Sequence, residues 1–158
     1  MSAIDPRRFG PDDLDAAFWD ACAEHRFCVH RCGTCGRSYW PASTCIDHGS
    51  AAMEWHEASG LGVVYTYTVV HHAYPPEDAD RVPYVLAVIR LDEGPFFHSD
   101  LVDCAPDDVH VDLRVELVWD DDAVVPIPRF APTPRSTTPD PHDGATPRGG
   151  PDDRDRTA

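Results

Sequence analysis

The spacing of apolar residues along this chain changes from a helical period to a series of short, strand-like runs. Between residues 12 and 25, DDLDAAFWDACAEH, apolar side chains recur every three or four positions, which predicts a helix with one apolar face. These positions are Leu14, Phe18, Ala21 and Cys22. Phe18 and Trp19 are adjacent, so they point about 100° apart around the helix axis. Either both rings pack onto the chain's own core, or one faces outward and can bind a partner protein.

From residue 60 onward, runs of β-branched and aromatic residues alternate with polar or Pro-rich segments. Such runs predict strands. The five expected strands lie within residues 60–72, 82–91, 95–102, 113–119 and 123–130, with a turn or one helical turn within 104–111. Five short strands without crossover helices favour a small antiparallel barrel or sandwich.

Residues 132–158 differ from the rest of the chain because they contain no Val, Ile, Leu, Met, Phe, Trp, Tyr or Cys. Such a segment cannot bury enough apolar surface to offset the entropy lost on ordering, so we expect a disordered tail. The expected organisation is a lead and helix at 1–25, a cysteine-rich module at 26–58, a strand-rich barrel at 59–131 and the tail at 132–158.

The chain has 158 residues and a formal net charge of −15. The tail holds four Arg and five Asp, so the acidity belongs to the rest of the chain. Strong acidity disfavours a general nucleic-acid binder and a binder of anionic membranes. No apolar run reaches membrane length, and residues 1–15 lack a signal-peptide pattern. We therefore expect a cytoplasmic protein with reduced thiols.

The cysteine-rich module contains two motifs with identical spacing. In CGTCG and CIDHG, two potential metal ligands are separated by two residues, and a Gly follows the second ligand. A Gly at that point lets the backbone turn with positive φ while amides point at the sulfurs. Cys32, Cys35, Cys45 and His48 form a set of three sulfurs and one nitrogen, which suits tetrahedral zinc. Four protein ligands leave no open position, so this zinc would be structural and not catalytic.

Two other interpretations of these motifs stay open. One is an emptied metal site that packing alone holds together, and the other is a redox pair. A thioredoxin-like Cys-x-x-Cys belongs to an α/β pattern, which this chain does not show. The apolar floor of the module is expected at Tyr39, Trp40, Pro41 and Trp55.

No arrangement of residues points to catalysis by this chain alone. His71 and His72 are adjacent on an expected strand, so their side chains point to opposite faces and cannot chelate together. His98, Ser99 and Asp100 are likewise neighbours on a strand and cannot adopt the geometry of a catalytic triad. The chain also lacks a Gly-rich phosphate loop and a helical HExxH motif.

The chain resembles the bacterial and archaeal family known as domain of unknown function 35 in five successive segments, FWDAC, RCGTCGRSYWPASTCIDHGS, EASGLGVVYTYTVVHH, PYVLAVIRLDEGP and VPIPRF. The resemblance covers about residues 15–131. It implies a mainly β fold, in which an N-terminal helix precedes a rubredoxin-like zinc ribbon and a five-stranded OB-fold barrel follows. The family's four ribbon cysteines fall on Cys32, Cys35, Cys45 and His48. The His is a departure from the family pattern and replaces one thiolate.

The resemblance also implies a function. Members of the family are acyl-CoA-associated accessory proteins that pair with thiolase-superfamily enzymes: thiolases, hydroxymethylglutaryl-CoA synthases and lipid-transfer-protein-like aldolases of steroid side-chain breakdown. The chain would then be a non-catalytic subunit of a complex that cleaves or forms carbon–carbon bonds in acyl-CoA, in the degradation of steroid side chains or of other lipids and aromatics. A dimeric partner enzyme would give a two-plus-two heterotetramer. The alternative is a free-standing acyl-CoA or lipid carrier without an obligate partner.

Two sets of residues are candidates for these roles. CoA is anionic, so some Arg must face it, although any one Arg also suits an ordinary surface position. The CoA candidates are Arg37, Arg81 and Arg129. The candidates for docking a partner are Leu14, Phe18 and Trp19. An OB fold more often binds nucleic acid through a basic groove, and the net charge of this chain disfavours that use.

Overall fold

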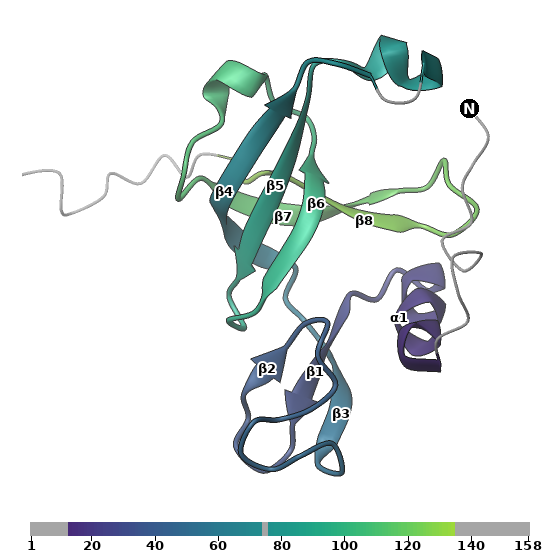
Figure 1. Cartoon of the computed structure of the whole chain (residues 1–158), viewed down its shortest axis with the longest axis vertical. Helices are drawn as coiled ribbons and strands as arrows, with labels where there is room; N and C mark the ends of the chain where they lie inside the picture. The colour runs from purple at the N-terminus through teal and green to yellow at the C-terminus, as the bar shows by residue number, and fades with distance from the viewer. Residues whose placement is uncertain (1–12, 74–75, 135–158) are drawn as a thin grey trace, which may run out of the picture.

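The structure is a computed structural model that describes residues 13–73 and 76–134. Within these residues, one α-helix, a three-stranded sheet and a closed five-stranded barrel follow one another along the chain (Figure 1). This order confirms the expected mainly β fold, with an N-terminal helix, a cysteine-bearing ribbon and a barrel. None of the helices in this part of the chain has the length and apolar character needed to cross a bilayer.

Helix α1 spans Asp13–Ala23 and buries the face that the apolar spacing predicts. Phe18, Ala21 and Cys22 are 2%, 4% and 0% exposed. Two residues after the helix ends, His25 has a left-handed backbone with φ 56°, and its N–H donates to the carbonyl of Cys22 at 2.9 Å. A left-handed residue just past the last turn is a common helix stop, and here it redirects the chain into the ribbon.

The ribbon, residues 28–57, is an antiparallel sheet of three short strands. They are β1 (Cys28–Cys32), β2 (Ser38–Tyr39) and β3 (Met53–Glu57), in the order β2–β1–β3. Strand β1 pairs with β3 along its whole length and with β2 at two positions. The loops that leave β1 and β2 carry the predicted metal ligands, so the sheet anchors both loops.

The barrel contains all five expected strands. They are β4 (Leu61–Val70), β5 (Tyr84–Leu91), β6 (Phe96–Leu101), β7 (Arg114–Asp120) and β8 (Ile127–Pro132), and they close in the order β4–β5–β6–β8–β7. A 3-10 helix, η2 (Pro76–Arg81), lies between β4 and β5, and another, η3 (Pro106–Asp108), lies between β6 and β7. The second occupies the place where the sequence predicts a single helical turn.

One strand pair differs from the antiparallel barrel that the sequence suggests. Strands β6 and β8 run parallel, with Leu101 opposite Phe130. In a closed ring, directions cannot alternate around an odd number of strands. A closed five-stranded barrel therefore contains at least one parallel pair, which no strand reveals by its own sequence.

The barrel continues slightly past residue 131, the expected end of this part of the chain. Strand β8 continues to Pro132, and the N–H of Thr133 donates to the carbonyl of Arg114 at 3.0 Å. These first tail residues therefore belong to the barrel edge. Residues 135–158 lie outside the described residues.

A single apolar core joins the helix, the ribbon and the barrel. The ring centroid of Phe18 in α1 lies 4.5 Å from the ring centroid of Trp40 in the ribbon and 6.3 Å from that of Phe97 in β6. Phe97 also contacts Phe27, which leads into β1, and Phe130 of β8. This aromatic cluster fixes the ribbon against the barrel. The tryptophans expected to form the ribbon's own small core, Trp40 and Trp55, therefore pack into a core shared with α1 and the barrel.

Candidate metal centre and adjoining surfaces

The structure brings the four predicted ligands of the ribbon together. Their ligand atoms all lie within 4.8 Å of one another. The two sulfurs of Cys35 and Cys45 are 3.8 Å apart. The Nδ1 atom of His48 lies 3.6 Å from the Cys32 sulfur and 3.5 Å from the Cys45 sulfur.

These distances fit a tetrahedral metal ion. With Zn–S bonds of about 2.3 Å and a Zn–N bond of about 2.0–2.1 Å, tetrahedral angles place two sulfurs about 3.8 Å apart and a sulfur and a nitrogen about 3.6 Å apart. The three separations given above match these edges. Three thiols and one imidazole are also the donor types that zinc prefers.

The repeated motif explains why the ligands converge. Gly36 and Gly49 both have φ 72°, a left-handed backbone that favours glycine. The N–H of Gly36 donates to the carbonyl of Cys32 at 2.7 Å, and the N–H of Gly49 donates to the carbonyl of Cys45 at 2.9 Å. The two halves of the pseudo-repeat therefore form the same turn, as their spacing predicts.

The surroundings of the site favour the thiolate form at Cys32 and Cys45, two of the three sulfur ligands. Backbone N–H groups, that of Cys35 above all, lower the pKa of the Cys32 thiol. The hydroxyl of Tyr39 is the largest influence on Cys45 and, with backbone N–H groups and His48, lowers the pKa of its thiol to about 6. The hydrogen bond to Cys45 raises the pKa of His48. The thiolates that favour a proton on His48 would also stabilise a metal cation in its place.

Arg37 lies beside this centre and not on the barrel. Its Nη1 atom is 3.0 Å from Asp47 Oδ2 and 3.2 Å from the hydroxyl of Tyr39. Tyr39 was expected in the apolar floor of the ribbon, but its hydroxyl lies 3.3 Å from the Cys45 sulfur. The spacing of the cysteines carries no signal for this contact, because it arises when β2 folds over the second ligand loop.

The other two arginine candidates meet on the barrel. Arg81 pairs with Asp100 at 3.1 Å, and Arg129 pairs with Asp100 and, at 2.7 Å, with Asp120. These four residues line an open hollow of about 480 Å³, and its walls also include Tyr84, Trp119 and Asp103. Burial lowers the pKa of Arg129, and the neighbouring Arg81 acts in the same direction. The structure therefore joins Arg81 and Arg129 in one site and leaves Arg37 apart from it.

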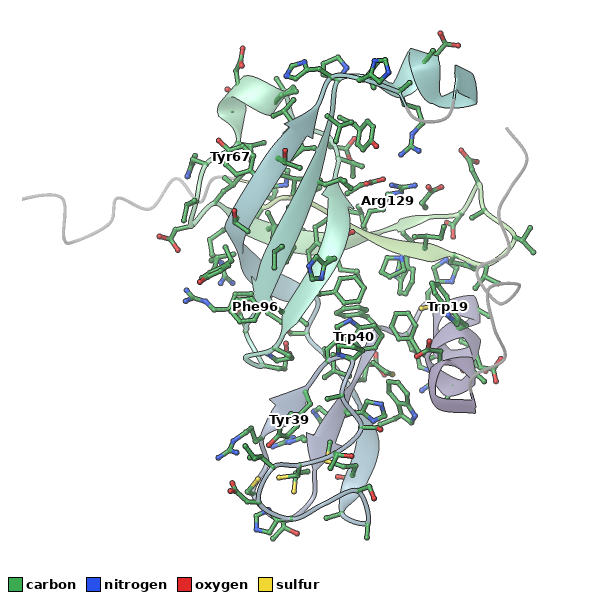
Figure 2. The ribbon with its side chains drawn as sticks, viewed as in Figure 1. Trp19, Tyr39, Trp40, Tyr67, Phe96 and Arg129 are labelled. Carbon is green, nitrogen blue, oxygen red and sulfur yellow. The ribbon has the colours of Figure 1, made fainter. Side chains whose placement is uncertain are left out.

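The helix separates its two aromatic rings. Phe18 is core, at 2% exposure, so it takes the inward place that the sequence left open between it and Trp19. Trp19 lies half-buried on α1 (Figure 2). It borders a second hollow of about 340 Å³, together with Leu86, Ile127 and Pro128. The side chain of Leu14 lies outside the described residues. A docking role for Trp19 stays a prediction.

The residues His98, Ser99 and Asp100 do not form a catalytic unit. The Ser99 hydroxyl donates to the carbonyl of Pro128 at 3.0 Å, and the carboxylate of Asp100 is engaged by two arginines. This hydroxyl ties β6 to β8 next to their parallel pairing, so its role is structural.

Comparisons with known proteins point to one family. The family model described as ChsH2, C-terminal OB-fold domain, matches residues 55–120. A DUF35 domain-containing scaffold protein of Methanocaldococcus jannaschii is 39% identical over 100 residues, which are 61% of this chain and 70% of that protein. A probable enoyl-CoA hydratase alpha subunit of Thermomonospora curvata is 38% identical over 121 residues. That match covers 75% of this chain but only 37% of the relative, so the chain spans little more than a third of its length.

Solved structures give the same fold. A structure described as the Ltp2–ChsH2(DUF35) aldolase matches with a TM-score of 0.67 and 34% identity, and the match covers 75% of this chain and 93% of that one. A DUF35 family protein from Sulfolobus solfataricus has a TM-score of 0.56 at 16% identity, which shows a likeness of fold alone.

Proposed function

The chain belongs to the DUF35 family, and from this premise we propose that it is a non-catalytic accessory subunit of an acyl-CoA enzyme. Its partner would be a thiolase-superfamily enzyme such as a lipid-transfer-protein-like aldolase, in a two-plus-two heterotetramer. The observation that carries the proposal is the likeness to the DUF35 chain of an Ltp2–ChsH2 aldolase over 93% of that chain. A second relative is named as the alpha subunit of a 3-oxo-4,17-pregnadiene-20-carboxyl-CoA hydratase of Mycobacterium tuberculosis, which supports an acyl-CoA substrate with a steroid body.

The proposed metal is one structural zinc ion at Cys32, Cys35, Cys45 and His48. The support is the tetrahedral spacing of their ligand atoms and the choice of donors. Bound zinc would cross-link the two ligand loops, and the ribbon is too small to be stable without such a link or its neighbours. Every coordination position would be filled by protein, so the ion would hold structure and would not activate a water.

The proposed contribution to acyl-CoA binding comes from Arg81 and Arg129. Both line the same open hollow, and Trp119 and Tyr84 give it apolar walls. In the free chain their charges are compensated by Asp100 and Asp120. A CoA phosphate must compete with these carboxylates, so we expect weak binding by the chain alone and tighter binding once a partner enzyme adds its own contacts.

The proposed docking site for the partner is the hollow between α1 and the barrel that Trp19 borders. Half-buried aromatic rings are common anchors at interface centres. Here the ring borders a hollow with apolar walls from β5 and β8, so a partner side chain that fills the hollow would contact both the helix and the barrel.

The test is co-expression with the Ltp2 aldolase component, followed by size-exclusion chromatography with light scattering. We expect a stable complex, and we expect Trp19→Ala to weaken association more than tenfold without change in metal content. Tyr65→Ala, on an exposed barrel residue, is the matched control. Phe18→Ala should instead lower the melting temperature of the isolated chain by several degrees. A monomer that ignores Ltp2 and binds acyl-CoA tightly by itself would favour the free-standing carrier.

A further inference from the structure

The three sulfur ligands of the proposed zinc site are not equivalent. Within residues 13–73 and 76–134, Cys45 is the sulfur ligand that accepts a hydrogen bond from a side chain outside the ligand set, the hydroxyl of Tyr39 at 3.3 Å. Figure 2 shows Tyr39 on the ribbon, next to the group of sulfur atoms. Cys35 lies at the exposed tip of its loop, whereas Cys45 is 1% exposed. The contact to Tyr39 is therefore shielded from water.

The Tyr39 hydroxyl has its proton directed at the sulfur. Its oxygen accepts from Arg37 Nη1 at 3.2 Å and from the backbone N–H of Ile46 at 3.4 Å. A phenolic hydroxyl offers one donor and two acceptor positions. Because both acceptor positions face donors, the one hydroxyl hydrogen is left for the Cys45 sulfur.

The partners of Tyr39 belong to the ligand loop itself. Ile46 follows Cys45 directly, and Asp47 holds Arg37 at 3.0 Å. The three side chains Tyr39–Arg37–Asp47, in which Arg37 donates to both neighbours and which we call the ribbon clasp, therefore link strand β2 to the loop between the two ligands Cys45 and His48. The ribbon clasp ties strand β2 to the second half of the metal site.

We propose that Tyr39, held by the ribbon clasp, is a positioning residue that keeps Cys45 bound to the metal. This inference rests on the metal site of the proposed function. Three thiolates around a divalent ion leave a net negative site, and a hydrogen bond to one sulfur withdraws part of that charge. The thiolate then attacks electrophiles more slowly and is protonated less readily. Residues that orient metal ligands through such bonds typically contribute about 10- to 100-fold to metal affinity. The inference also gives Arg37 a role on the ribbon in place of CoA binding.

The test uses Tyr39→Phe, which removes one oxygen and leaves the ring. Zinc release from the full chain is followed with excess 4-(2-pyridylazo)resorcinol, and the relative rates of thiol alkylation by iodoacetamide are mapped by mass spectrometry. We expect zinc release to be about tenfold faster, and we expect alkylation of Cys45 to speed up relative to Cys32, the other buried sulfur ligand. Tyr65→Phe, on an exposed tyrosine of the barrel, should match the wild type.

A spectroscopic measurement separates positioning from a general loosening of the fold. With Co²⁺ in place of zinc, Tyr39→Phe should shift the thiolate-to-metal charge-transfer band, while the far-UV circular dichroism stays the same. Arg37→Gln should give a smaller shift in the same direction, and it serves as the second variant if Tyr39→Phe fails to fold. Unchanged zinc release, alkylation rates and cobalt spectrum in Tyr39→Phe would overturn the inference and leave the zinc site standing. Wild-type protein that binds neither zinc nor cobalt would overturn both.

Discussion

The ribbon and the barrel are both small β structures, yet different forces hold them together. The barrel has its own interior, in which Val64, Ile89, Val115 and Phe130 are each 0% exposed. The ribbon has strands of two to five residues, and its two tryptophans, Trp40 and Trp55, pack against the core that it shares with α1 and the barrel. Apolar burial alone can stabilise the barrel, whereas a sheet as small as the ribbon needs a cross-link. The metal centre is that cross-link in our proposal.

The largest expected effect is the loss of a ligand from the ribbon. Cys35→Ser should abolish tight zinc binding and unfold the ligand loops, because structural zinc contributes roughly 10 kcal/mol or more to small zinc-dependent folds. Elemental analysis and thermal melting measure both effects. Cys22→Ala, at a buried cysteine of α1, is the control and should keep one zinc per chain. Equal zinc contents in the two variants would show that Cys35 is not a zinc ligand and would contradict the assignment of the site to the ribbon.

The matching change in the barrel is Phe130→Ala. The ring is fully buried and contacts Phe27 and Phe97, so its removal should lower the free energy of unfolding by about 3–5 kcal/mol. The folded fraction should still carry zinc, because the cavity lies in the barrel. Denaturant unfolding and zinc analysis of the folded protein test the two expectations separately. A folded variant without zinc would show that the ribbon depends on the barrel more than on its ligands.

Acid should affect the ribbon before the barrel. The folded pKa of the Cys45 thiol is about 6, below its ordinary value of 9.0. The thiolate therefore stabilises the folded ribbon fully above pH 9, and that contribution is lost as the pH falls through about 6. Protonation also competes with the metal. Dialysis at pH 8, 7, 6 and 5 should show zinc loss near and below pH 6 while the barrel's circular dichroism persists. Zinc lost already at pH 8 would contradict the lowered pKa.

A smaller effect is expected at the ion pairs beside the parallel strands. Arg129→Met leaves Asp120 without its arginine and Asp100 with Arg81 alone. The side chains of Arg129 and Asp100 are only 19% and 16% exposed, so we expect a loss of about 1–2 kcal/mol in unfolding free energy, less than for a fully buried pair. Arg114→Gln breaks an exposed pair with Asp92 and should cost below about 1 kcal/mol. Equal losses would mean that burial adds nothing to the Arg129 pairs.

Much of the fold was predictable because it depends on local pattern. The three- and four-residue spacing in α1 and the β-branched runs of β4 to β8 report which face of each element is apolar. The direction of β8 beside β6 was not predictable in this way. It follows from closing five strands into a ring, and no single strand carries that information.

The four residues of the candidate metal site were the part of the site that the sequence by itself determined. Two residues of each pair lie within one turn, and the following glycine sets the turn, so Cys32, Cys35, Cys45 and His48 could be assigned without tertiary structure. The choice of Phe18 as the buried ring needed the tertiary structure, because Trp40 and Phe97 arrive from other elements.

The arginines show the same limit most clearly. The sequence offers no way to rank Arg37, Arg81 and Arg129 as candidates for CoA binding. The fold places Arg37 against Tyr39 and joins Arg81 to Arg129 through Asp100. The carboxylate that joins them lies 19 residues after Arg81 in the chain. Charged side chains take their roles from partners that register and barrel curvature bring within hydrogen-bond distance, and those partners exist only once the chain has folded.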